Sequence, residues 1–216
     1  MSNFTKNWAR PQNEGGIREN IRGSLRSTGP LKPRLEQALR QINIQVAKLE
    51  TAAIKLKDRD KKIFSKVVIA IQKHDMSYAS VYANELSEVR KMHKMVTSAQ
   101  LALEQITMRL STVQELGDIV VTLSPAMSII REVKGGLTSI LPEAENEINE
   151  IGSLLSGILV DAGQLGGSTL NFEAANEEAE NIMAEASAVA EERMKDKFPD
   201  LPSPAKTSDT GTISFG

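Results

Sequence analysis

The stretch from Arg34 to Leu116 contains neither glycine nor proline, although the chain of 216 residues holds 14 glycines and 8 prolines. Because these two residues are the strongest breakers of helices, their absence over so long a stretch predicts extended helical structure. The stretch is also rich in alanine, leucine, lysine, glutamate and glutamine, which favour helices. Alternation of polar and apolar residues, the pattern of a strand, is nowhere sustained in it.

Apolar residues in this stretch recur every seven positions, in interleaved rows. Such spacings of three and four place them on the face of a helix that packs along another helix. Asp60 interrupts one row. The rows are Leu35, Ile42, Leu49, Leu56 and Ile63; Leu39, Val46, Ala53 and Val67; Val89, Val96, Leu103 and Leu110; and Met92, Ala99, Ile106 and Val113.

A hairpin satisfies this pattern better than one straight helix, which would be about 125 Å long. In a hairpin each apolar row finds its partner within the chain. We expect the break at 72–77, where Asp75 or Ser77 can cap the second helix. An alternative break at 57–60 gives arms of less equal length. The arms are predicted at roughly 34–73 and 76–114, although an inert structural hairpin fits the periodicity equally well.

Helices become shorter after Gly117. Pro125 predicts a short or kinked helix over 118–130, and Gly135 and Gly136 predict a break. Pro142 suits the first turn of a helix that runs to about Val160.

The predicted fold is all-α: a long antiparallel helical hairpin, then short helices and a C-terminal acidic helix. The predicted segments are a basic N-terminal membrane-contact segment (1–30), the hairpin (31–116), short helices (117–162), a flexible linker (163–171), the acidic helix (172–197), a proline-rich docking motif (198–204) and a disordered tail (205–216).

Charge is divided unevenly along the chain, although the net charge is only -2. Residues 1–100 hold 19 basic and 9 acidic side chains, whereas residues 101–216 hold 7 basic and 19 acidic ones. A basic half is suited to an anionic surface, and an acidic half can fold back on it or meet a neighbouring molecule.

Signals of catalysis are absent from the sequence. With 0 cysteines there are no disulfides, thiolate metal sites or cysteine nucleophiles. His74, at the expected turn, and His93, on an expected helix surface, are too far apart for a local metal motif. No phosphate-binding loop, nucleophile elbow or zinc-protease motif occurs. We therefore expect no enzyme activity, no cofactor and no metal, and the glutamate-rich stretches 143–150 and 173–192 are interpreted as solvated helix faces.

No apolar run approaches the length of a membrane span, and no secretory segment follows Met1. A cytoplasmic protein is therefore expected. The N-terminal residues nevertheless favour contact with a membrane surface, because apolar residues spaced by four lie beside arginines with the same spacing. A disordered tail, a strap along the hairpin, or nucleic-acid binding would use the same residues. The candidate membrane-binding residues are Phe4, Trp8, Ile17, Arg18, Ile21, Arg22, Leu25 and Arg26.

The first arm of the hairpin supplies a second candidate surface. Its basic side chains would face anionic headgroups or the acidic surface of a neighbour. These residues are Lys55, Lys57, Arg59, Lys61, Lys62 and Lys66.

The run Phe-Pro-Asp-Leu-Pro-Ser-Pro at 198–204 is a third candidate site. Proline fixes φ and extends the chain, so that Phe198 and Leu201 could dock in a groove at low entropic cost. A plain linker is the alternative interpretation.

Taken together, these features resemble the ESCRT-III family, and most closely the archaeal cell-division proteins of the CdvB type. The resemblance covers about residues 1–204. It is carried by the basic first arm, by the stretch 71–86 at the hairpin tip, by 110–116, and by Ile182-Met183-Ala184-Glu185-Ala186 followed by Phe-Pro-Asp-Leu-Pro. Because few residues follow Pro204, we expect a shorter paralogue without the C-terminal winged-helix region of some members.

The resemblance implies a filament subunit that remodels membranes during cell division, at the constricting neck on the inner face of the membrane. It implies assembly with further copies and with paralogous subunits, through shorter helices that fold back in a closed monomer or extend in the polymer. It also implies disassembly by an AAA ATPase, whose MIT domain would bind the motif residues Phe198, Pro199, Leu201 and Pro202.

Two other classes of protein are weighed against this one. A basic coiled-coil protein that binds nucleic acid would use the same charge, but aromatic residues are not interleaved along the arm as base stacking requires. A passive structural coiled coil would have a fixed stoichiometry and would ignore lipid.

Overall fold

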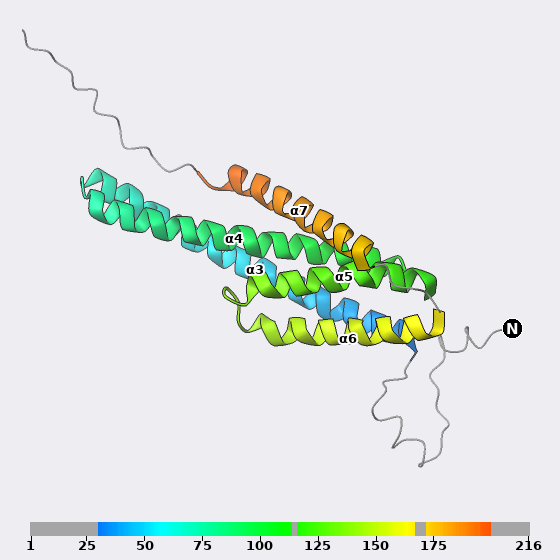
Figure 1. Ribbon diagram of the computed structural model, residues 1–216. Coiled ribbons are helices and arrows are strands. Elements are labelled where there is room, and N and C mark those ends of the chain that lie inside the picture. The colour runs from blue at the N-terminus through cyan, green and yellow to red at the C-terminus, as the bar shows by residue number, and fades with distance from the viewer. Residues whose placement is uncertain (1–29, 114–115, 167–171, 200–216) are drawn as a thin grey trace, which may run out of the picture.

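The computed structural model describes residues 30–113, 116–166 and 172–199, which form an all-α fold (Figure 1). Within these ranges there are five helices and no strand, so the predicted fold class is confirmed. The predicted membrane-contact residues, most of the proline-rich motif and the tail lie outside the described residues. The helices are α3 (Leu31–Gln72), α4 (Met76–Ser111), α5 (Leu116–Leu137), α6 (Ala144–Gly166) and α7 (Phe172–Lys197).

Helices α3 and α4 form the long antiparallel hairpin, which turns where the polar break was expected. The Asp75 carboxylate accepts a hydrogen bond from the Tyr78 backbone N–H at 3.2 Å and so caps α4. His74, between the two helices, has a φ of 58°, a left-handed conformation that lets the chain reverse at once. The alternative break at 57–60 lies inside α3.

The predicted apolar rows form the seam between the two arms. Most of their residues are buried, and the base of the hairpin shares one continuous core with the later helices. A smaller, separate cluster closes the part of the hairpin nearer its tip. That second cluster is built on Ile63, Val67, Leu86 and Val89.

Helices α5, α6 and α7 cover only part of the hairpin. Helix α6 lies along the first half of α3 and packs on α5, while α7 lies along α4 and also contacts α5 (Figure 1). The tip of the hairpin projects beyond α5 and α6. The acidic half of the chain therefore lies against the basic hairpin in this structure.

Helix α5 is longer than the sequence predicted. It continues through Pro125 and through Gly135 and Gly136, which were expected to kink or break it. A proline inside a helix costs about 3 kcal/mol, and burial of one whole helix face opposes that cost. The buried apolar residues of this face are Ile119, Val120, Leu123, Ala126, Ile129, Ile130, Val133 and Leu137.

Helix α6 also exceeds its predicted end. It runs to Gly166, whereas a flexible linker was expected from residue 163. Ala162 and Ile158 are fully buried on its inner face. Tertiary contact therefore extends α6 into a glycine-rich sequence that would not remain helical alone.

None of the described helices is both long and apolar enough to span a membrane.

Replacing a core residue of the seam tests this packing. Leu103 is 0% exposed on α4, and we expect Leu103→Ala to lower the free energy of unfolding by about 2–5 kcal/mol, because the lost burial leaves a cavity. Met108, on the same helix, is 61% exposed, so Met108→Ala should change it by less than about 0.5 kcal/mol. Urea denaturation followed by circular dichroism measures both, and equal losses would contradict the assigned packing.

Candidate functional site

Ion pairs join the basic hairpin to the acidic helix α7. Lys94 Nζ lies 2.8 Å from Glu191 Oε2, and Arg109 pairs with Glu178. The ammonium of Lys94 donates a hydrogen bond to Glu191, and together with Lys195 it lowers the pKa of that carboxyl. In both pairs the cation belongs to α4 and the carboxylate to α7.

A second set of ion pairs joins α3 to α6 with the same polarity. Arg34 pairs with Asp161, and Lys48 Nζ lies 2.6 Å from Glu147 Oε2. Hydrogen bonds from Lys48 and then from Gln45 lower the pKa of Glu147. Among the described residues, every ion pair between the hairpin and the later helices therefore places its cation on the hairpin.

These ion pairs orient the later helices on the hairpin but contribute little to the free energy that attaches them. Most of the paired side chains are partly exposed, and exposed pairs contribute only about 0–1 kcal/mol each. Apolar contacts carry the rest of the attachment. On α7 they involve mainly alanines, which bury little area, so the attachment is shallow.

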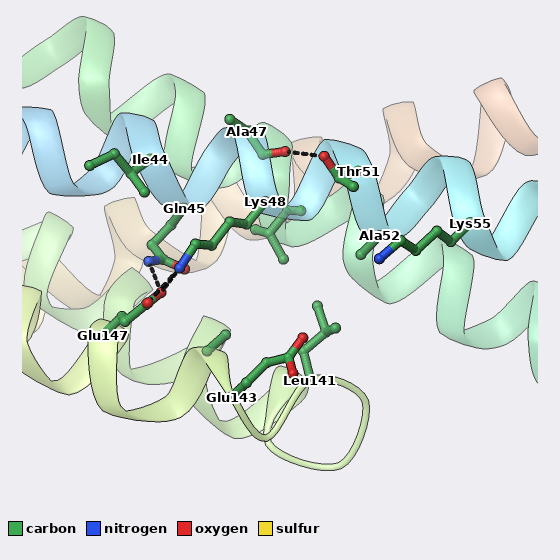
Figure 2. A pocket seen from close by; sticks show the side chains of 12 residues that line it. Ile44, Gln45, Ala47, Lys48, Thr51, Ala52, Lys55, Leu141, Glu143 and Glu147 are labelled. Atoms are coloured by element: carbon green, nitrogen blue, oxygen red, sulfur yellow. Dashed lines mark hydrogen bonds and ion pairs between the residues drawn. The ribbon is translucent and has the colours of Figure 1, made fainter.

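A groove lies between α3 and the segment that leads into α6 (Figure 2). It encloses about 570 Å³ and is lined by Ile44, Ala52 and Leu141, among others. The ion pair between Lys48 and Glu147 spans one side of it, with Gln45 donating to the same carboxylate. The groove is an apolar trough with a charged rim.

No cluster of three or more histidine, aspartate or glutamate side chains that could hold a metal ion occurs within the part of the chain that the structure describes.

Asp60, the residue that interrupts an apolar row, lies buried in the hairpin seam with a partner. It is 2% exposed, and its Oδ1 accepts a hydrogen bond from Arg90 Nε at 2.7 Å. Removing one partner of such a pair leaves an uncompensated buried charge and costs about 3–5 kcal/mol. The guanidinium of Arg90 is thereby fixed in place on α4.

Phe198, the first residue of the predicted docking motif, lies against this guanidinium. Phe198 is 9% exposed, and the centroid of its ring is 5.5 Å from Arg90 Cζ. The rings of Phe198 and His93 meet edge to face, with centroids 4.9 Å apart and an interplanar angle of 76°. Arg90 Nη2 also donates to the Pro199 carbonyl at 2.9 Å. We call Asp60, Arg90 and His93 the Phe198 site.

His93 is buried, whereas the sequence placed it on a helix surface. It is 7% exposed, with Nδ1 lying 3.4 Å from Thr97 Oγ1. Its spacing of four from Val89, a seam residue, was the available signal. What the sequence could not indicate is that Phe198, far along the chain, covers it.

Burial is the main cause that lowers the pKa of His93 from its ordinary value of 6.5, and the charge of Lys197 lowers it further. Asp60 opposes this shift and Lys57 adds to it. The groups around the imidazole thus come from α3, α4 and α7. Arg90 lies on α4, the helix that also carries His93.

The basic residues of the first arm do not share one face. Lys55, Arg59, Lys62 and Lys66 follow the spacing i, i+4, i+7, i+11, which aligns them on one flank of the seam. We call these four residues the basic stripe. Lys57 and Lys61 lie on the other flank by the same helical geometry.

Two residues of the basic stripe already have partners on α4. Arg59 Nη2 lies 2.8 Å from Glu85 Oε1, and Lys66 Nζ lies 5.4 Å from the centroid of the Tyr82 ring. The Lys55, Lys62 and Lys66 side chains are exposed. The remaining predicted site residues lie outside the described ones: Phe4, Trp8, Ile17, Arg18, Ile21, Arg22, Leu25, Arg26, Leu201 and Pro202.

Two proteins of Sulfolobus acidocaldarius are similar to this chain over most of its length. Cell division protein B1 is 43% identical over 177 residues, which cover 82% of this chain and 83% of that protein. Cell division protein B is 34% identical over 177 residues, which cover 80% of this chain and 68% of that protein. No family model and no solved structure matches the chain.

The lowered pKa of His93 predicts how docking of Phe198 depends on pH. Because the docked state binds a proton less readily, docking is strongest above pH 6.5, where His93 is neutral, and weakens as the pH falls through the lowered pKa. Phe198→Ala should uncover the imidazole and move the pKa of His93 toward 6.5. NMR titration of the 2 histidines measures this change. Tyr78→Ala, at the hairpin tip, should leave His93 unchanged, and an equal response to both substitutions would contradict the assignment.

Proposed function

The chain belongs to the CdvB-type ESCRT-III proteins of archaeal cell division, and from this premise we propose that it is a subunit of a membrane-bound filament at the division site. The relatives carry the names of cell division proteins, which supports a role in that process. Polymerisation on the membrane, constriction of the neck and removal of subunits by an AAA ATPase are the finer parts of the proposal.

The observation that carries the proposal is the uniform polarity of the ion pairs between the two halves. Because each of these pairs among the described residues has its cation on the hairpin, release of α6 and α7 would uncover Arg34, Lys48, Lys94 and Arg109 together. A surface that is covered within the monomer by acidic helices can then bind the acidic helices of a neighbouring copy or of a paralogous subunit. The same contacts would thus close the monomer and join the polymer.

The basic stripe supports contact with an anionic membrane. Lys55, Lys62 and Lys66 are exposed on α3, and Lys55 borders the groove beside the start of α6. Each lysine near such a surface contributes about 1 kcal/mol. The N-terminal residues Phe4 and Trp8 would add insertion into the lipid. We place the protein in the cytoplasm, peripherally on the inner face of the membrane.

The AAA ATPase would bind the motif at 198–202 through its MIT domain and pull subunits from the filament. In this scheme any turnover belongs to the ATPase, and this chain is not an enzyme. The names of the relatives fit a non-enzymatic subunit.

Sedimentation with liposomes tests the membrane part of the proposal. Lys62→Gln/Lys66→Gln removes two charges of the basic stripe, and we expect binding to anionic vesicles to weaken roughly 30-fold, from about 1 kcal/mol per lysine. Binding of the unaltered chain should also fall as salt is added. Electron microscopy of the pellets should show coated or tubulated vesicles.

The matched control is Lys32→Gln/Lys91→Gln, which removes the same charge from exposed positions outside the stripe. Equal losses in the two double variants would mean that net charge, and not the stripe, governs binding. Phe4→Ala/Trp8→Ala reports separately on the N-terminal residues. Absence of pelleting under every condition, together with binding to duplex DNA, would favour the nucleic-acid interpretation instead.

A further inference from the structure

We propose that Arg90 and His93, held in place by Asp60, form a binding site on the hairpin for the aromatic–proline segment at the end of α7, and that this site competes with the MIT domain for Phe198. The competition rests on the proposed function, because it assumes that the motif binds an ATPase. The binding site itself rests only on contacts within the chain.

The site presents chemistry suited to an aromatic residue followed by a carbonyl. Arg90 offers a cation 5.5 Å from the ring centroid, and His93 offers a second ring that meets the first edge to face. The same guanidinium donates to the carbonyl of Pro199, the next residue along the chain, at 2.9 Å. An aliphatic side chain in place of Phe198 would keep the burial but lose both ring-specific contacts.

The hairpin alone orients the site. Asp60 on α3 accepts from Arg90 Nε at 2.7 Å, and this contact involves no residue of α7. The guanidinium therefore keeps its Nη2 and one of its faces available for the segment that arrives from α7. Release of Phe198 would leave behind a pre-formed site rather than a collapsed one.

Phe198, directly after α7, is the largest buried side chain beyond Ile182, and Met183 and Val189 are partly buried there. Beyond Ile182, the buried apolar residues of α7 are alanines until the chain reaches Phe198. The buried set is Ala175, Ala179, Ile182, Ala186, Ala190 and Phe198. Loss of this one ring should therefore loosen the end of α7, whereas the exposed ion pair of Lys94 and Glu191 would hold it only weakly.

Two partners cannot hold the same ring. While Phe198 is buried between Arg90 and His93, a groove on another protein cannot enclose it. The apparent affinity of the chain for the MIT domain is then the intrinsic affinity of the motif multiplied by the fraction of molecules in which Phe198 is undocked. The hairpin thus sets how readily a subunit is recognised.

Phe198→Leu separates the two uses of the ring. Leucine keeps an aliphatic anchor for the MIT domain but loses the contacts with Arg90 and His93. We expect the full chain carrying Phe198→Leu to bind the MIT domain about tenfold more tightly than the unaltered chain. A synthetic peptide of residues 194–204, which lacks the hairpin, should show no increase in affinity for the MIT domain from the same substitution. Calorimetric titration measures all four affinities.

The NMR signal of His93 reports directly on occupancy of the site, because the ring of Phe198 lies against the imidazole. Phe198→Leu should shift this signal in the full chain. Saturating the unaltered chain with the MIT domain should move it to the same position. Tyr78→Ala, which leaves the site intact, should change neither the signal nor the affinity.

The outcomes distinguish the two proposals. If the MIT domain binds the chain while the NMR signal of His93 stays fixed, the proposed competition is wrong. It is also wrong if Phe198→Leu weakens the affinity of the full chain for the MIT domain as much as it weakens the affinity of the peptide. If the MIT domain binds neither chain nor peptide, the docking part of the proposed function fails. In that case the NMR signal of His93 in the full chain still decides whether the hairpin binds Phe198. If Phe198→Leu does not shift this signal, the proposed binding site is wrong as well.

Discussion

The apolar seam between α3 and α4 is the contact on which the rest of the structure depends. Packing of one apolar helix face against another supplies most of the stability of helices in proteins. At its base the seam merges with the core under α5, α6 and α7, whereas nearer the tip it closes on a cluster of its own. The hairpin is therefore both the scaffold for the later helices and, toward its tip, a unit that packs without α5 and α6.

The later helices attach to this scaffold in two physically different ways. Helix α6 packs on α3 and α5 through large aliphatic residues such as Ile148, Ile151 and Leu155. Helix α7 buries mostly alanines and is held at one end by Phe198. Because apolar area sets the free energy of burial, α7 is the part that can leave with the least loss. The same helix carries the carboxylates that pair with Lys94 and Arg109, so its departure would change the charge of the exposed surface.

Much of the fold could be predicted from the sequence because its signals are local and periodic. The hairpin break follows from a polar patch that offers Asp75 or Ser77 as a cap, of which Asp75 is the cap observed, and the apolar rows predict the seam. The uninterrupted α5 could not be predicted, because Pro125 and two glycines disfavour a continuous helix when the sequence is considered alone. The burial of one whole helix face, which opposes this cost, is known only from the structure. The Phe198 site was beyond the sequence for another reason. It joins residues of α3, α4 and the end of α7, and no local pattern records that contact.

The buried pair of Asp60 and Arg90 has a mechanical consequence. A slip of α4 along α3 by one heptad would keep apolar residues in contact but would separate the two charges and leave the carboxylate of Asp60 buried without a partner. The arms of the hairpin are thus locked against sliding, and a load applied along one arm passes to the other with little elongation. A filament built from such subunits would change its length or curvature at the joints between molecules and not within the hairpins, which would act as struts of constant length.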